Sequence, residues 1–222
     1  MKSIRIWGID VYLHWTMLLM LMMFVMHHGP AGILVCAVLY GSVLLHEFGH
    51  AAATNLMGYR CKKIVLLILG GVAFQEMRMK TKHRLIAYVA GPVVSFLLTI
   101  IGVGTTLALV HFNALPPTHS IANLVLGYFV WINMILLIFN LLPIYPMDGG
   151  GIMHCINLIR KSNEIEACKI TAQVSIIGCV GLCAYGIYQM HLFLIFFSVL
   201  FFFMNKSLYL NGEQGSASKD AW

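Results

Sequence analysis

Hydrophobic residues gather in six long runs, separated by short stretches that hold most of the polar and turn-forming residues. The runs cover residues 11–27, 31–57, 85–110, 121–142, 170–189 and 191–205. A helix of roughly 20 apolar residues spans a hydrocarbon core of about 30 Å, so each run is near the length of one transmembrane helix. The pattern predicts an all-α polytopic membrane protein, built as a bundle of about six transmembrane helices.

One segment between the second and third runs departs from the helical pattern. Residues 63–74 are apolar and rich in β-branched side chains, but Gly70 and Gly71 interrupt them and the segment is too short to span as a helix. Backbone at membrane depth must be paired within the protein. We therefore expect a short β-hairpin or re-entrant segment at the membrane edge.

The composition supports the bilayer as the main solvent of this chain. Of 222 residues, 60% are hydrophobic and 10% are charged, and the mean hydropathy is +0.86. A soluble domain of this size has too little polar surface to cover so much apolar area. We expect a single transmembrane domain over residues 1–210 and a flexible C-terminal tail of small and polar residues over 211–222.

The basic residues are distributed unevenly among the connections. All fourteen Lys and Arg residues lie at the two termini or in the connections after the second and fourth runs. The positive-inside rule then places both termini in the cytoplasm. The net charge of +6 is thus a topology signal, with contact to anionic lipids as an addition, and it does not indicate nucleic acid binding.

The cysteines and the N-terminus bear on processing. The six cysteines show no paired spacing, so we expect no disulfide framework and a reduced state. The first apolar run leads directly into the second without a small-residue cleavage site, so we expect no cleavable signal peptide.

The strongest chemical motif lies in the second run, where His46-Glu47-Phe48-Gly49-His50 reads HExxH. On a helix, residues i and i+4 face the same side, so both imidazoles can bind one Zn²⁺ while Glu47 accepts a proton from a water activated by the metal. The alternative is that the three side chains only satisfy one another in a helix core. Three polar groups are expensive inside a bilayer without a metal or partner, which favours the zinc site.

A catalytic zinc normally has three protein ligands and one open position. The best third candidate is Asp148, which follows the fourth run in a stretch with two prolines and three glycines. The prolines break the helix and the glycines free the backbone, which can bring the carboxylate to the depth of His50. The alternative is that Asp148 only caps the helix that follows.

These motifs together resemble the site-2 protease family of intramembrane zinc metalloproteases. The resemblance rests on HExxH in an apolar helix, a Gly-Gly segment, Ala90-Gly91-Pro92, and Asn-x-x-Pro ahead of Asp-Gly. It covers about residues 8 to 160 and is greatest to the compact six-span bacterial branch whose sporulation proteases act on a sigma-factor precursor. A PDZ-like insertion and the CBS domain carried by some of that branch are missing from these 222 residues.

The resemblance implies a function and a set of roles. Zinc would be held by His46, His50 and Asp148, with Glu47 as the general base. Asn140 and Pro143 would shape the substrate cleft, and Gly70-Gly71 would offer a strand edge to the substrate. The expected substrates are transmembrane or membrane-associated proteins in a bacterial cell membrane, cut in regulated proteolysis such as sigma-factor release or removal of signal-peptide remnants. The oligomeric state stays open.

Three other functions remain as alternatives. A metal-ion transporter would need polar residues through both halves of the bundle, and no acidic residue lies in the outer halves. An inactive membrane scaffold would have no reason to keep four costly polar groups. A prenyl-protein protease would normally use Glu as the third ligand. His154 and Cys155 stay as minor candidates for a supporting or alternative ligand role.

Overall fold

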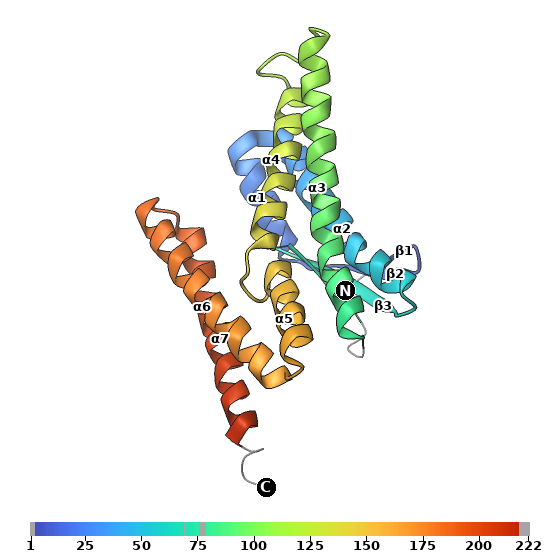
Figure 1. The fold of residues 1–222 in the computed structure, drawn as a ribbon. Coiled ribbons are helices and arrows are strands. Elements are labelled where there is room, and N and C mark those ends of the chain that lie inside the picture. Colours follow the sequence, from blue (N-terminus) through green and yellow to red (C-terminus); the bar gives the residue numbers. More distant parts are fainter. Residues whose placement is uncertain (1–2, 69, 76–78, 218–222) are drawn as a thin grey trace. The chain divides into compact units, whose positions relative to one another are not determined.

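The computed structural model describes residues 3–68, 70–75 and 79–217, and Figure 1 shows its elements. The helices are α1 (Met17–His28), η1 (Gly29–Ala31, a 3₁₀ turn), α2 (Gly32–Leu56), α3 (Thr81–His111), α4 (Ile121–Leu141), α5 (Asp148–Lys161), α6 (Glu164–Tyr188) and α7 (Leu192–Ala217). The strands are β1 (Ser3–Ile6), β2 (Ile9–Leu13), β3 (Cys61–Leu67) and β4 (Gly70–Gln75). The predicted fold class, a helical membrane protein with a small β element, is confirmed.

Five helical segments of the described chain are long and apolar enough to cross a membrane. They are Met17–Leu56, Thr81–His111, Ile121–Leu141, Glu164–Tyr188 and Leu192–Leu210. The first contains two helices, α1 and α2, which are separated by the 3₁₀ turn η1 and pack against each other. The six predicted apolar runs therefore correspond to six helices, which are α1, α2, α3, α4, α6 and α7.

The predicted hairpin is confirmed and belongs to a larger sheet than expected. Strands β3 and β4 pair antiparallel over residues 61–75. Two N-terminal strands extend this hairpin, and the strand order is β1-β2-β3-β4. Strands β1 and β2 are joined by Trp7 and Gly8, whose φ angles of 50° and 82° suit a tight two-residue turn. Residues 11–13, the start of the first predicted helical run, are strand.

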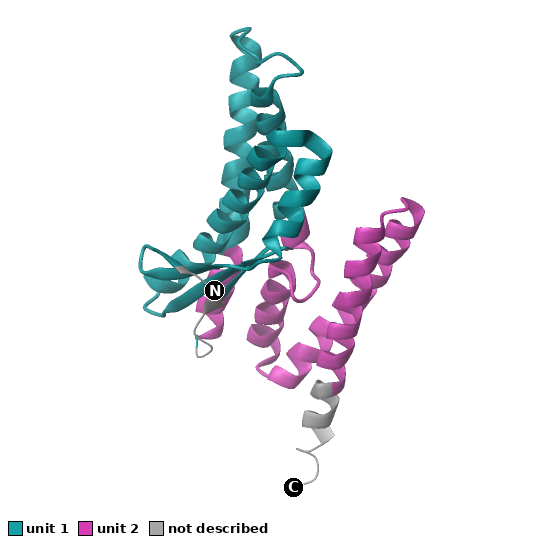
Figure 2. Cartoon of the chain, turned by 180° about the vertical axis from the view of Figure 1, so that it is seen from behind, with its two compact units in different colours: residues 1–79, 90–138 teal, residues 80–89, 139–222 magenta. Residues whose placement is uncertain are grey.

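The chain divides into two compact units, which Figure 2 colours teal and magenta. The first unit contains residues 1–79 and 90–138 and holds the sheet. Strand β2 runs parallel to β3, and the connection between them is made by α1, η1 and α2. Alternate residues of the strands face a hydrophobic core that the sheet shares with α2. The buried residues of this core include Ile9, Val11, Ile64 and Leu66 from the strands and Tyr40, Val43, Phe48 and Ala51 from the helix.

Close helix packing in the first unit depends on small residues of α2. A Cβ on Gly49 would lie 2.8 Å from the Ala90 carbonyl oxygen and 2.8 Å from Val94 Cγ2, so α2 and α3 touch backbone to backbone here. The amide of Asn133 on α4 donates to Ser42 Oγ on α2 at 2.9 Å. Asn133 therefore makes an inter-helix hydrogen bond, as is common within membranes.

The second unit contains residues 80–89 and 139–222. Helix α5 packs on α6, and α6 packs along α7. Helix α5 ends at Lys161, and its C-cap Ser162 is in the left-handed conformation with φ 52°. Asn163 then caps α6 by accepting from the Ile165 amide at 3.1 Å. Helix α7 runs to Ala217, so it continues beyond residue 210, where we expected a tail to begin. The last five residues of that expected tail lie outside the described residues.

Candidate metal and active site

The HExxH residues lie on one side of α2 and are buried. His46, Glu47 and His50 are 3%, 7% and 5% exposed. His46 and His50 are four residues apart, so their imidazoles lie on the same face of the helix, about one turn from each other. Such polar side chains are seldom buried in an apolar helix unless a partner compensates for their lost hydration.

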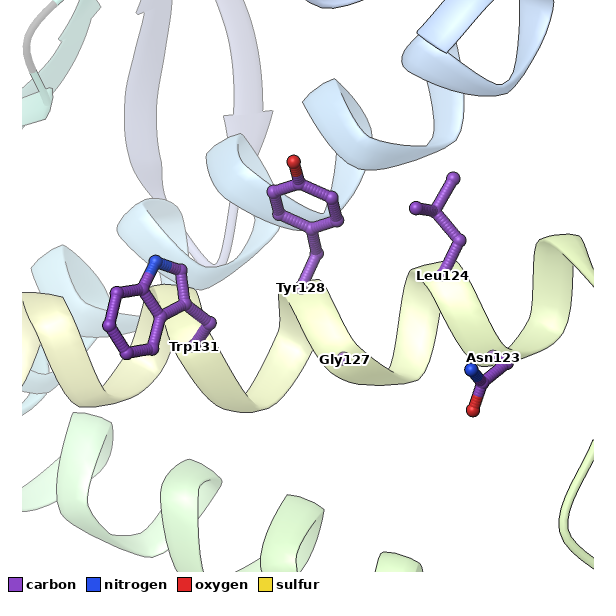
Figure 3. A pocket seen from close by; sticks show the side chains of 5 residues that line it. All are labelled: Asn123, Leu124, Gly127, Tyr128 and Trp131. Carbon is purple, nitrogen blue, oxygen red and sulfur yellow. The ribbon is translucent and has the colours of Figure 1, made fainter. Parts of the chain in front are cut away.

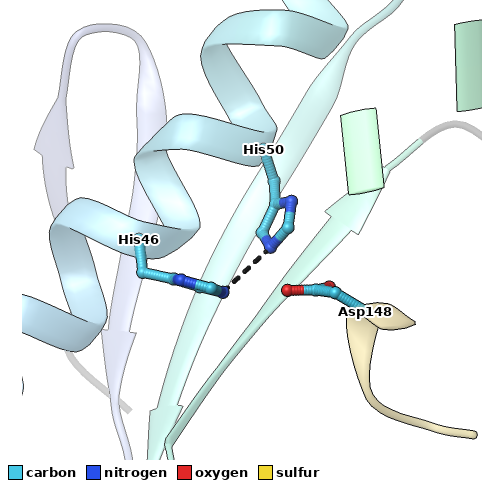
Figure 4. Close-up of side chains that lie close together, drawn as sticks. All are labelled: His46, His50 and Asp148. Atoms are coloured by element: carbon cyan, nitrogen blue, oxygen red, sulfur yellow. Dashed lines mark hydrogen bonds between the residues drawn. The ribbon is translucent and has the colours of Figure 1, made fainter. Parts of the chain in front are cut away.

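The two imidazoles present their Nε2 atoms to the same point. Figure 4 shows the pair, with Nε2 of His46 and Nε2 of His50 3.2 Å apart. A tetrahedral zinc with Zn–N bonds of about 2.0–2.1 Å holds two ligand nitrogens roughly 3.3 Å apart. The observed spacing therefore fits coordination of one zinc ion by both histidines.

A serine on α3 orients the first histidine. Ser95 Oγ lies 2.9 Å from Nδ1 of His46, and Ser95 is fully buried. A hydrogen bond at one ring nitrogen fixes the ring and leaves the other nitrogen for a metal, as is usual for metal-binding histidines. We did not predict this role for Ser95. Its one signal in the sequence is that it follows Gly91 by four residues, and so shares a helix face with it.

Two glycines let backbone approach these side chains. A Cβ on Gly91 of α3 would lie 2.3 Å from His50 Nε2 and 2.8 Å from His46 Nε2. A Cβ on Gly71 of β4 would lie 2.5 Å from Glu47 Cγ. The backbone of the Ala-Gly-Pro and Gly-Gly segments thus packs directly on the polar side chains of the site. A side chain at Gly91 would displace the imidazoles, and one at Gly71 would displace Glu47.

The third predicted ligand begins α5. Asp148 is the first residue of that helix, and the N-cap is Met147, which makes no side-chain cap hydrogen bond. Asp148 is therefore not the residue in the N-cap position. His46, His50 and Asp148 form a candidate metal-ligand group in the described chain (Figure 4).

Glycines also explain the start of α5. A Cβ on Gly149 would lie 2.3 Å from the Leu142 carbonyl oxygen, and one on Gly150 would lie 2.4 Å from the Tyr145 amide nitrogen. A Cβ on Gly151 would lie 2.6 Å from the ring of Tyr88. The run of three glycines lets the first turn of α5 press against the connection before it and against α3.

The predicted substrate-binding residues lie on three elements. Asn140 is part-buried in the last turn of α4, and Pro143 is exposed in the connection to α5. Gly70 and Gly71 begin β4, which stands at one end of the strand order. Their roles toward a substrate stay predictions.

His154 and Cys155 are not among the candidate metal ligands and lie deeper in α5. Cys155 is fully buried and is hydrogen-bonded by the Arg84 side chain. Burial raises the pKa of the Cys155 thiol, and Arg84 opposes that rise. Burial lowers the pKa of His154, with a further contribution from Arg84. Cys155 thus contacts Arg84 at the start of α3, while His154 is hydrogen-bonded to the Ala167 backbone of α6.

Another polar cluster joins α4 to α1. The Tyr128 hydroxyl lies 2.7 Å from His28 Nε2. Tyr128 is also one of five α4 residues that line a surface hollow (Figure 3). The hollow is open and its lining is mainly apolar; the other lining residues are Asn123, Leu124, Gly127 and Trp131. His28 is thereby accounted for as a contact between helices.

Comparison with known sequences identifies the family to which this chain belongs. The profile of peptidase family M50 matches residues 34–116 and 117–182, which contain every candidate metal ligand and Glu47. The chain belongs to peptidase family M50.

A solved structure is similar to this M50 chain in both fold and sequence. The site-2 protease from Methanocaldococcus jannaschii superposes with a TM-score of 0.65 and 30% identity, covering 94% of this chain and 95% of that one. The resemblance to site-2 proteases is therefore confirmed.

Two relatives are similar in sequence over much of this M50 chain. A zinc metalloprotease from Methanocaldococcus jannaschii is 31% identical over 209 residues, which are 91% of this chain and 58% of the relative. Stage IV sporulation protein FB from Bacillus subtilis is 28% identical over 186 residues, which are 82% of this chain and 59% of that protein. The chain thus spans little more than half the length of either relative.

Proposed function

We propose that this chain is an intramembrane zinc metalloprotease that hydrolyses peptide bonds of membrane-embedded or membrane-associated proteins near the cytoplasmic face. The observation that carries the proposal is the buried HExxH site, with two imidazole nitrogens 3.2 Å apart beside Glu47, in a helix of an M50 chain. The candidate spans support a multi-pass membrane protein.

His46 and His50 would hold the zinc through their Nε2 atoms, and Asp148 would supply the third ligand. Zinc bound there would act as a Lewis acid toward water and the substrate carbonyl. With Nε2 on the metal, His46 Nδ1–H would donate to Ser95 Oγ, which keeps the ring in place, and the Gly91 backbone packs directly on both imidazoles.

Glu47 would act as the general base. Its carboxylate accepts a proton from the attacking water and returns a proton to the nitrogen of the leaving amine, which completes hydrolysis of the amide. The backbone at Gly71 packs on the Glu47 side chain, so the carboxylate and the start of β4 are adjacent.

The edge of β4 would bind the substrate. A substrate helix hides its amides in its own hydrogen bonds, so it must become extended before hydrolysis. Pairing as an added strand at Gly70-Gly71 would hold it extended, with Asn140 and Pro143 shaping the cleft. The support is that β4 is an edge strand and that Gly71 touches Glu47.

The cellular setting follows from the charges and the relatives. We place the chain in a bacterial cell membrane with both termini in the cytoplasm, as a single protease domain over residues 1–210 with a tail over 211–222. Similarity to a sporulation protein supports regulated proteolysis, through sigma-factor or transcription-factor release or removal of signal-peptide remnants.

The decisive experiment compares purified wild type with Glu47→Gln. The variant keeps both histidines, so we expect it to retain zinc, while cleavage of a transmembrane reporter falls about 10²–10⁴-fold. Both proteins are assayed for zinc content and for cleavage in the same detergent or vesicles. A variant that cleaves at the wild-type rate would contradict the protease mechanism.

A further inference from the structure

The connection between α4 and α5 is held by polar side chains of α6 and α7. The Tyr145 amide donates to Ser175 Oγ at 3.0 Å, and the Tyr145 carbonyl accepts from Asn205 Nδ2 at 2.6 Å. Ser175 and Asn205 are each fully buried. Both backbone polar groups of Tyr145 are therefore bonded by side chains from two other helices.

Helix α6 makes further contacts with the same connection. The Ser175 hydroxyl also lies 3.5 Å from the Pro143 carbonyl, to which it can donate. A Cβ on Gly178 would lie 2.8 Å from Ile144 Cγ1, and Ile144 is 1% exposed. Residues 143, 144 and 145 thus all contact Ser175 or Gly178 of α6.

These polar side chains are costly at their positions. Each is fully buried, where a leucine or alanine would pack without a hydrogen-bonding requirement. Asn205 even leaves Oδ1 without a hydrogen-bond partner among the described residues, and a buried unsatisfied polar atom costs about 1–3 kcal/mol. The bonds to Tyr145 give a reason for both residues.

The fixed connection leads directly to Asp148. Gly149 and Gly150 press against the backbone of residues 141–145, at distances that leave no room for a Cβ. Because these are contacts of backbone on backbone, no flexible side chain lies between Tyr145 and the first turn of α5. The Tyr145 peptide is therefore in direct backbone contact with the first turn of α5, which begins at Asp148.

We propose that Ser175 and Asn205 are positioning residues, which clamp the Tyr145 peptide and so hold the Asp148 carboxylate in place for zinc. This inference rests on the proposed role of Asp148 as the third ligand. It gives the last two helices a role in the site, although neither contributes a ligand.

The test uses Ser175→Ala and Asn205→Leu in the full chain, with Ser198→Ala as the matched control. Ser198 lies in α7, is 1% exposed and donates to the Leu194 carbonyl of its own helix at 2.6 Å. Zinc affinity is measured by competition with a chromogenic chelator. We expect both clamp variants to bind zinc about 10–100-fold more weakly, as when a ligand loses its supporting contact, and the control to match wild type.

A double-mutant cycle asks whether the clamp acts through Asp148. Once Asp148→Asn has weakened the site, Ser175→Ala should weaken zinc binding no further, because the positioned ligand is gone. Additive losses, or clamp variants with wild-type affinity, would overturn the positioning role. Asp148→Asn with wild-type zinc affinity would instead overturn the third-ligand proposal, so the two failures are distinguishable. Thermal unfolding of the zinc-free proteins shows that losses in affinity are not losses of fold.

Discussion

At the scale of single residues, two glycines let the backbone contact the side chains of the site directly. Gly91 brings the α3 backbone onto the two imidazoles, and Gly71 brings the β4 backbone onto Glu47. The contacts that a Cβ would make, at 2.3 and 2.5 Å, are far inside van der Waals distance. Even a methyl group at either position must therefore move a functional side chain or a helix.

We expect Gly91→Ala to lose zinc binding and proteolysis, because the added methyl occupies the space of His50 Nε2. The matched control is Gly104→Ala in the same helix, where a Cβ would meet nothing within 4 Å. Zinc content and cleavage are measured for both purified variants. Equal zinc content in the two would mean that the α3 backbone does not constrain the imidazoles.

Ser95 offers a milder test of the same site. Removing its hydroxyl in Ser95→Ala takes away the bond to His46 Nδ1, and we expect a loss of about 10–100-fold in zinc affinity or activity. Thr105→Ala on the same helix is the control, since that hydroxyl bonds the Ile101 carbonyl of its own helix. A Ser95 variant as active and as tightly metallated as this control would show that the ring needs no support there.

The sequence was a good guide to residues that form a pattern and a poor one to single residues. His46, Glu47 and His50 were predicted because helical spacing forces i and i+4 onto one face. Ser95 and Asn205 were not, because a lone polar residue in an apolar run fits an inter-helix contact equally well. Their partners lie 49 and 60 residues away, a separation that no local spacing encodes.

At the scale of elements, the start of α3 runs antiparallel to α5. Tyr88 packs on Gly151, and Arg84, one turn earlier, bonds Cys155, one turn later. Both pairs lie within the second unit. Helix α5 is amphipathic, so it lies outside the apolar runs, and it was expected only as the helix that follows Asp148. Strands β1 and β2 were missed, since β2 gains its pairing from β3, about fifty residues on.

The packing of α5 predicts an acid sensitivity. Burial, and then Arg84, lower the pKa of His154, while Glu164 and a bond to the Ala167 backbone oppose the shift. Above the ordinary histidine pKa of about 6.5 both states are neutral. Below it the unfolded chain binds a proton that the folded chain resists, so stability falls as the pH falls toward the lowered value.

We therefore expect His154→Gln to flatten the fall in melting temperature between pH 7.5 and 5.5, measured in detergent. His119→Gln, at an exposed position before α4, is the control and should keep the wild-type slope. An unchanged slope in His154→Gln would show that His154 is not the group that responds.

At the scale of the whole molecule, the basic residues predict the orientation in the membrane. We expect a cysteine at Thr118 to react with a membrane-impermeant maleimide on intact cells, and a cysteine at Lys82 to react only after the cells are opened. Both positions are exposed, one before α4 and one at the start of α3. Labelling is measured above that of the parent chain with its six native cysteines. The reverse pattern would invert the topology and move the site to the other face.

The parallel pairing of β2 with β3 has a consequence for how the chain is made. Residue 13 pairs with residue 66, and α1 and α2 lie between them in the sequence. A ribosome that adds roughly 5–20 residues per second needs several seconds to supply the second strand. During that interval β2 lacks the strand with which it pairs in the folded chain, while the residues of α1 and α2 are being synthesised. The first segment to be synthesised can thus complete its sheet only after the residues of the HExxH helix have been synthesised.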